Sequence, residues 1–157
     1  YQRSLKIRKK INDISGIAVT LNNIGYVFNI QGDLNKALEY YLNGLKLKEE
    51  IGEKYPISTS LNNIGSIYEE LGDTSKGLTF YYRSLKLREE LGDKLGIASS
   101  LNNISSTELN LKKNGRVEIK TKLLRALILS QDVGSPRLIS ESSLNLSRLA
   151  QMDNHYH

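Results

Sequence analysis

Few side chains in this 157-residue sequence could carry out catalysis. The chain contains no cysteine, which excludes thiol chemistry, disulfides and cysteine-ligated zinc. Its two histidines, His155 and His157, fall within the last three positions, where chain ends fray and hold a metal or a substrate poorly. The acidic pairs at 49–50 and 89–90 stand beside lysine and arginine, as on a solvated helix surface. We therefore expect no enzyme, no cofactor and no metal site.

Three asparagine pairs are better suited to binding than to catalysis. They are Asn22-Asn23, Asn62-Asn63 and Asn102-Asn103, each preceded by leucine and followed by isoleucine. An asparagine amide offers both a donor and an acceptor to a peptide group of a ligand. Successive pairs are 40 residues apart, so they also mark a sequence repeat.

The charged residues argue against a nucleic-acid partner. The 22 basic and 17 acidic residues give a net charge of +5, but most of them stand beside residues of opposite charge, as in residues 46–50 and 86–90. Such mixed charge is typical of a solvated helix face. Only residues 6–10 and 112–125 are basic on balance, which gives weak support for an anionic partner. No apolar run approaches the roughly 20 residues that cross a bilayer, so we expect no membrane span and a cytoplasmic protein.

The repeat extends well beyond the asparagine pairs. Residues 21–60 and 61–100 are identical at about 19 of 40 aligned positions. Upstream, residues 1–8 align with 81–88, and downstream the match continues at an offset of 42, which places two extra residues near 112–115. The sequence therefore predicts an array of similar units.

Each unit has the pattern of two antiparallel helices. Leu21, Ile24 and Phe28 recur at helical spacing and form one apolar stripe. The Gly32-Asp33 turn ends this helix and supplies an N-cap for the next one. Gly52 then ends the second helix. We expect helices of about 16 residues and no strands.

The pattern of large, small and aromatic residues resembles the tetratricopeptide repeat. In the first unit these residues are Leu21, Ile24, Gly25, Phe28, Ala37, Tyr41 and Gly44. In the second unit they are Leu61, Ile64, Gly65, Tyr68, Gly77, Tyr81 and Ser84. The third unit departs from the pattern, with Ser105 for the glycine and Glu108 for the aromatic residue. The period of 40 resembles the subclass found in kinesin light chains, spindle-orientation adaptors and bacterial signalling proteins. The resemblance implies that Tyr41, Tyr68 and Tyr81 belong to the core.

The resemblance implies an all-α fold, a right-handed solenoid of antiparallel helix pairs over residues 1–157. We expect the second helix of a truncated repeat at 1–12, full pairs at 15–52, 55–92 and 95–134 (the last degenerate), a lone helix at 136–152 and a tail at 153–157. Because a repeat cannot bury its faces alone, we expect further repeats to flank this segment in a longer parent chain.

Helical geometry divides the first helix of each pair into two faces. At 100° per residue, Asn23 points about 150° away from the apolar stripe. In the tetratricopeptide family this far face lines a concave groove, which the resemblance implies here. The candidate groove residues are Val19, Asn23, Tyr26, Ile30, Thr59, Asn63, Ser66, Glu70, Ser99, Asn103, Ser106 and Asn110. Two interpretations stay open for Asn22, Asn62 and Asn102, which either bond between neighbouring helices or face the ligand. Tyr26 is a candidate binding anchor.

The sequence thus favours a protein-interaction module that holds a peptide or a partner's helix in the groove. An alternative is the sensor or regulatory segment of a larger bacterial signalling protein, such as a histidine kinase or transcription regulator, whose output domain is absent from this chain. RNA binding by helical repeats predicts a period near 35 residues and a basic groove, and neither is present. The residues of a groove vary without disturbing the fold, so the sequence does not name the partner.

Overall fold

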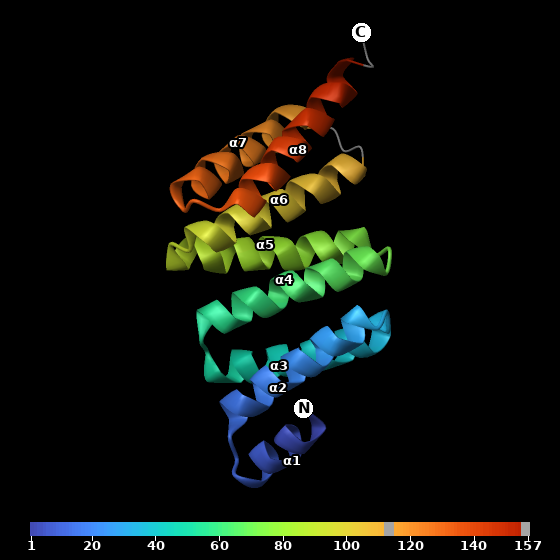
Figure 1. The fold of residues 1–157 in the computed structure, drawn as a ribbon, viewed down its shortest axis with the longest axis vertical. Coiled ribbons are helices and arrows are strands. Elements are labelled where there is room, and N and C mark those ends of the chain that lie inside the picture. Colours follow the sequence, from blue (N-terminus) through green and yellow to red (C-terminus); the bar gives the residue numbers. More distant parts are fainter. Residues whose placement is uncertain (112–114, 155–157) are drawn as a thin grey trace. The chain divides into compact units, whose positions relative to one another are not determined.

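A computed structural model describes residues 1–111 and 115–154, and this part of the chain is helical throughout apart from short turns (Figure 1). The helices are α1 (Gln2–Lys10), α2 (Ile14–Ile30), α3 (Leu34–Ile51), α4 (Lys54–Glu70), α5 (Thr74–Leu91), α6 (Lys94–Asn110), α7 (Arg116–Asp132) and α8 (Pro136–Asn154). The prediction of an all-α fold is confirmed. The inserted residues predicted near 112–115 fall mostly outside the described residues, as do both histidines.

Local capping explains where several helices begin and end. The Asp33 carboxylate accepts a hydrogen bond from the Lys36 amide at the start of α3. Asp13 and Asp93 do the same at the starts of α2 and α6. Gly52 ends α3 in the left-handed conformation, with φ of 82°, which a side chain would disfavour. Helix α8 continues to Asn154, two residues beyond the predicted limit.

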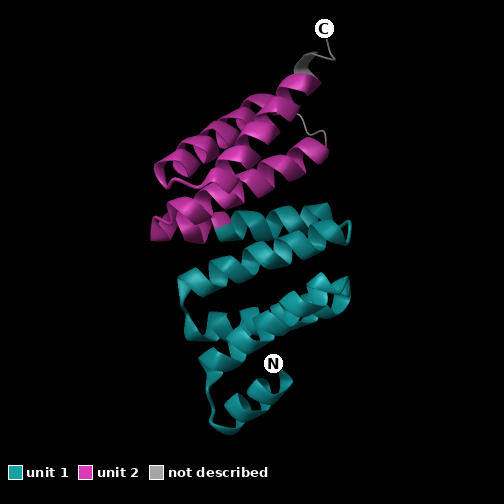
Figure 2. Ribbon diagram, viewed as in Figure 1, with its two compact units in different colours: residues 1–84 teal, residues 85–157 magenta. Residues whose placement is uncertain are grey.

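The chain divides into two compact units, residues 1–84 and 85–157, and the boundary falls inside α5 (Figure 2). In the first unit α1 packs against α2, α2 against α3, and α3 against α4. In the second unit α7 packs against both α6 and α8, and α6 also contacts α8. Consecutive helices within each unit run antiparallel (Figure 1). None of the described helices combines the length and the apolar character needed to cross a membrane.

The core of the first unit is built on a glycine facing a tyrosine. Tyr41 and Tyr81 are each only 2% exposed. A Cβ atom on Gly25 would lie 2.9 Å from the Tyr41 ring, and one on Gly65 would lie 2.7 Å from the Tyr81 ring. Both glycines therefore let a helix approach a ring more closely than any other residue could. The predicted core positions of Tyr41 and Tyr81 are confirmed.

Tyr68 was expected in the core, and that expectation is wrong. Its side chain is half-buried and stacks on Phe80, with ring centroids 5.3 Å apart and planes 16° apart. The ammonium of Lys76 lies 5.3 Å from the centre of the Tyr68 ring and keeps this edge of the core polar. Phe28 and Tyr40 form the equivalent stack one repeat earlier, at 5.4 Å and 13°.

The second unit places different residues at the same repeat positions. Adding 40 to Tyr68 gives Glu108, and adding 42 to Phe80 gives Lys122. These two residues form an ion pair with a Nζ to Oε2 distance of 2.8 Å, and their side chains are only 11% and 22% exposed, respectively. The stack of the first unit is therefore replaced by an ion pair.

The glycine–tyrosine interlock is also replaced in the second unit. The residue equivalent to Gly65 is Ser105, and the one equivalent to Tyr81 is Leu123. Both Ser105 and Leu123 are fully buried. Since leucine is shorter than tyrosine, the helix that carries Ser105 does not need a glycine. Leu123 packs in a core cluster with Leu109, Ile119 and Leu149.

Candidate binding surface

The candidate groove residues lie on the first helix of each pair, α2 and α4 in the first unit and α6 in the second. None of them is buried. Val19, Tyr26 and Ile30 are the most open apolar members, with exposed fractions of 49%, 56% and 68%. Glu70 and Asn110 are also exposed, and the half-buried members are Asn23, Thr59, Asn63, Ser66, Ser99, Asn103 and Ser106.

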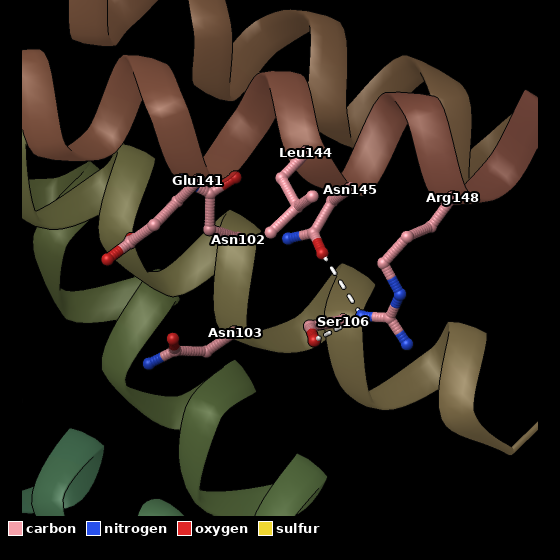
Figure 3. Close-up of a pocket in the computed structure, with 7 residues that line it drawn as sticks. All are labelled: Asn102, Asn103, Ser106, Glu141, Leu144, Asn145 and Arg148. Carbon is pink, nitrogen blue, oxygen red and sulfur yellow. Dashed lines mark hydrogen bonds between the residues drawn. The ribbon is translucent and has the colours of Figure 1, made fainter.

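A pocket of about 240 Å³ opens between α6 and α8 in the second unit (Figure 3). Two candidate groove residues, Asn103 and Ser106, line it from α6. The other lining residues are Asn102, Glu141, Leu144, Asn145 and Arg148. Its walls therefore combine amides, a hydroxyl, one carboxylate and one guanidinium with the exposed aliphatic side chain of Leu144.

Arg148 connects the two helices that form this pocket. Its guanidinium donates to Asn110 Oδ1 at 2.7 Å and, more weakly, to Ser106 Oγ and Asn145 Oδ1, both at 3.4 Å. The last two bonds are drawn in Figure 3. Two of these partners, Ser106 and Asn110, are candidate groove residues. The guanidinium is thus held in place at the pocket while part of its charge stays available to an acceptor on a ligand.

The asparagine next to the groove position has a structural role in the third pair. Asn102 is 2% exposed. Its amide donates to the Leu138 carbonyl at 3.4 Å, and its Oδ1 accepts from the Ser142 hydroxyl at 2.9 Å. Asn102 therefore bonds α6 to α8, as one of the two open interpretations required. In the first pair, the buried Oδ1 of Asn22 has no hydrogen-bond partner among the described residues.

Helix α8 contributes lining residues that were not among the predicted groove positions. The groove positions of α6 are 99, 103, 106 and 110, and the offset of 42 maps the first three onto Glu141, Asn145 and Arg148. All three line the pocket. The sequence carries a signal for these residues, because the downstream offset of 42 extends the predicted groove positions of α6 to α8, which is itself predicted as a first helix.

In the first unit, the hydroxyl of the buried Tyr81 bonds to α4 at Glu69, next to the candidate groove residue Glu70. Ser66 donates to Glu70 at 3.2 Å, and the Tyr81 hydroxyl donates to Glu69 Oε2 at 3.1 Å. Burial, followed by the nearby Glu69 carboxylate, raises the pKa of Tyr81 well above its ordinary value. Burial likewise raises the pKa of Tyr41. Both hydroxyls therefore remain protonated and neutral.

Repeated antiparallel helix pairs with interlocking small and large residues define a helical-repeat protein. Residues 16–76 match the tetratricopeptide repeat, so the resemblance noted in the sequence is confirmed. Members of the tetratricopeptide repeat family, which this segment matches, are in general protein–protein interaction modules.

Among solved structures, the crystal structure of BtubC (BKLC) from P. vanneervenii is similar to this chain. The two share 16% sequence identity with a TM-score of 0.57, over 92% of this chain and 67% of that chain. At this identity the likeness concerns the fold alone. No curated protein matches the sequence.

Proposed function

We propose that this chain binds an extended peptide or a helix of a partner protein on the surface formed by α6 and α8, the first helices of two successive repeats in the second unit. The observation that carries the proposal is the pocket between α6 and α8, which is lined at equivalent repeat positions of both helices. The tetratricopeptide repeat supports a protein partner in general, and the chemistry of the pocket supports a segment with an exposed main chain.

The lining groups fit a peptide better than a small apolar ligand. Asn103 offers both a donor and an acceptor, which can pair with one peptide group. Arg148 adds a cation that suits a carboxylate on the bound segment. Leu144, 63% exposed, provides an aliphatic contact at the edge of the pocket. A peptide can make all three contacts, because its main chain offers peptide groups and its side chains offer a carboxylate and an apolar surface.

The proposal can be tested without knowing the natural partner. Random 12-residue peptides displayed on phage would be selected against the whole chain, and the affinity of the selected peptides measured by fluorescence anisotropy. Asn103→Ala is expected to weaken binding about 2- to 10-fold, as for the loss of one hydrogen bond. Arg148→Ala is expected to weaken the acidic peptides more, because a charged hydrogen bond is lost.

Lys120→Ala serves as the matched control, since Lys120 is an exposed residue of α7 outside the pocket. The control should leave every affinity unchanged. Peptides that bind equally well to Asn103→Ala and Arg148→Ala would place the binding surface elsewhere and contradict the proposal.

A further inference from the structure

A second pocket, of about 390 Å³, lies in the first unit where α1, α2 and α3 meet. Its apolar lining residues are Ile14, Ile17, Leu21 and Leu47, and its polar ones are Lys9, Asn43, Lys46 and Glu50. No candidate groove residue contributes to it. The pocket involves second helices of two successive pairs, α1 and α3, whereas the groove residues lie on first helices.

In the next two repeats, an ion pair joins the two second helices at the place equivalent to this pocket. Glu49 of α3 accepts from Arg83 of α5 at 3.0 Å. One repeat later, Glu89 of α5 accepts from Arg125 of α7 at 2.6 Å. The residues equivalent to this acid and this base around the pocket are Lys9 and Asn43. Lysine and asparagine cannot form the ion pair, so the connection between successive second helices is missing here.

The charge around the pocket is one-sided as a result. Lys9 and Lys46 are exposed, and the side chain of neither forms a hydrogen bond or ion pair within the part of the chain that the structure describes. Lys6 and Lys10 are exposed nearby in the same helix, and Glu50 is the one acidic residue of the lining. An occupant with a carboxylate would supply the charge that Glu49 and Glu89 supply at the equivalent positions.

The apolar lining of the pocket indicates that the occupant also carries an aliphatic group. Ile17, Leu21 and Leu47 are half-buried aliphatic residues, and Ile14 is 44% exposed. Covering such surface is favourable in proportion to the apolar area removed from water. No aromatic residue lines the pocket, so it offers no platform on which a nucleic-acid base could stack. The occupant is thus both acidic and aliphatic, which is typical of a protein segment.

We propose that this pocket binds a segment of a partner protein that inserts an aliphatic side chain between α1, α2 and α3. An adjacent carboxylate of the segment pairs with Lys9 and Lys46. The partner thereby supplies from outside the ion pair that the two later repeats form within the chain. This surface is separate from the pocket between α6 and α8, and it does not depend on the function proposed for that pocket.

Three small probes test the proposal by methyl NMR of the whole chain labelled at isoleucine and leucine. They are acetyl-Leu-Glu-Leu-amide and its analogues with Gln or Lys in the central position. The Glu peptide is expected to shift the methyl signals of Ile14, Ile17 and Leu47. The Gln peptide should bind about threefold more weakly, as for the loss of one partly exposed ion pair. The Lys peptide should give no shifts there.

A variant that copies the later repeats provides the matched control. Lys9→Glu with Asn43→Arg installs the ion pair of the equivalent positions and should abolish the shifts while keeping the helical circular dichroism. If this variant does not fold, Lys9→Ala, which removes one exposed charge, should weaken the Glu peptide about threefold. Lys120→Ala, an exposed position of α7 outside both pockets, should leave the titration of these methyl signals unchanged.

Three outcomes would overturn the proposal. The first is equal binding of the Glu, Gln and Lys peptides. The second is retention of the shifts in the folded double variant. The third is a stronger response of the same methyl groups to a short oligouridylate, which would assign the pocket to nucleic acid.

Discussion

The pair α4–α5 and the pair α6–α7 solve one packing problem with different chemistry. Where the first has the stacked rings of Tyr68 and Phe80, the second has the ion pair of Glu108 and Lys122. Where the first has Gly65 against Tyr81, the second has Ser105 and Leu123 at the same positions. Both members of each couple change together. The repeat therefore requires a complementary pair of side chains rather than a fixed residue at each position.

The aromatic stack and the ion pair differ in how much stability a single substitution removes. An aromatic pair adds about 0.5–1.5 kcal/mol beyond the area it buries, and its loss is spread over many weak contacts. A largely buried ion pair gains little net free energy, because the desolvation of both charges offsets their attraction. Removing one charge, however, leaves the other desolvated and unpaired. The second unit should therefore be the more sensitive to a single substitution.

Breaking the ion pair should give the largest effect. Lys122→Ala removes the cation that pairs with the mostly buried Glu108 carboxylate and is expected to lower the free energy of unfolding by about 3 kcal/mol. The double substitution Glu108→Tyr with Lys122→Phe transfers the stack of the first unit and should return stability to within about 1 kcal/mol of the native value. Urea denaturation measures both. A double variant no more stable than Lys122→Ala would show that the couples are not interchangeable.

Filling the glycine of the first unit should give the next largest effect. In Gly65→Ala the new Cβ would lie 2.7 Å from the Tyr81 ring, so the helices must separate. We expect a loss of about 1–3 kcal/mol in the same denaturation experiment. Adding Tyr81→Leu imitates Ser105 and Leu123, and the double variant should lose less than the sum of the single losses by at least about 0.5 kcal/mol. Strict additivity would argue against coupling.

A smaller, stabilising effect is expected at the corresponding residue of the second unit. The buried Oγ of Ser105 has no hydrogen-bond partner among the described residues, so Ser105→Ala should raise stability by about 0.5–1 kcal/mol. Ser100→Ala is the matched control, since its Oγ accepts from Arg88 at 2.8 Å. That change should lower stability by about 1–2 kcal/mol. If Ser105→Ala is destabilising too, the hydroxyl is bonded in solution.

The smallest expected difference concerns acid. A hydrogen bond from Lys76 holds the pKa of Asp73 below its ordinary value, and Lys36 does the same for Asp33. A carboxyl group whose pKa is lowered by folding stabilises the fold. Its contribution is complete above the pKa of the unfolded chain, at about pH 4, and is lost as the pH falls through the pKa of the folded state. The equivalent N-cap of α7 is Gly115, which has no side-chain acceptor.

Hydrogen exchange between about pH 5 and pH 3 should therefore show an extra acid-induced loss of protection in α5 before Ser84 that is absent from α7. Asp73→Asn keeps an N-cap oxygen but removes the charge, so it should flatten this pH dependence. An unchanged profile in Asp73→Asn would assign the acid sensitivity to other groups.

The features that the sequence predicted are mostly local in origin. The 40-residue period, the Asp33 cap and the Gly52 terminator each depend on a few neighbouring residues, and all are present in the structure. Rotation about a helix axis was also enough to place Asn103 and Ser106 beside one pocket. Such arguments need only the spacing of residues within one helix.

The features that the sequence did not predict depend on pairs of helices. Ser105 and Glu108 read as departures from the repeat until Leu123 and Lys122 are placed against them with the offset of 42. The burial of Asn102 depends on Ser142 and Leu138 of α8, which no pattern within α6 reveals. Tyr68 matched the repeat signature, yet its exposure is set by Phe80 and Lys76 at the margin of the core.

The coupled replacements have a consequence for recombination between repeats. Consider a crossover in the turn after α6 that joins α6 to a helix like α5. Ser105 would then lie against a tyrosine, and Glu108 against an aromatic ring. Such a chimera would combine a steric clash with the loss of the Lys122 cation beside the buried Glu108 carboxylate. A crossover in the turn between two pairs keeps every couple intact. The helix pair is therefore the unit that recombination can exchange. Adding or removing whole pairs keeps the complementary side chains within each pair together.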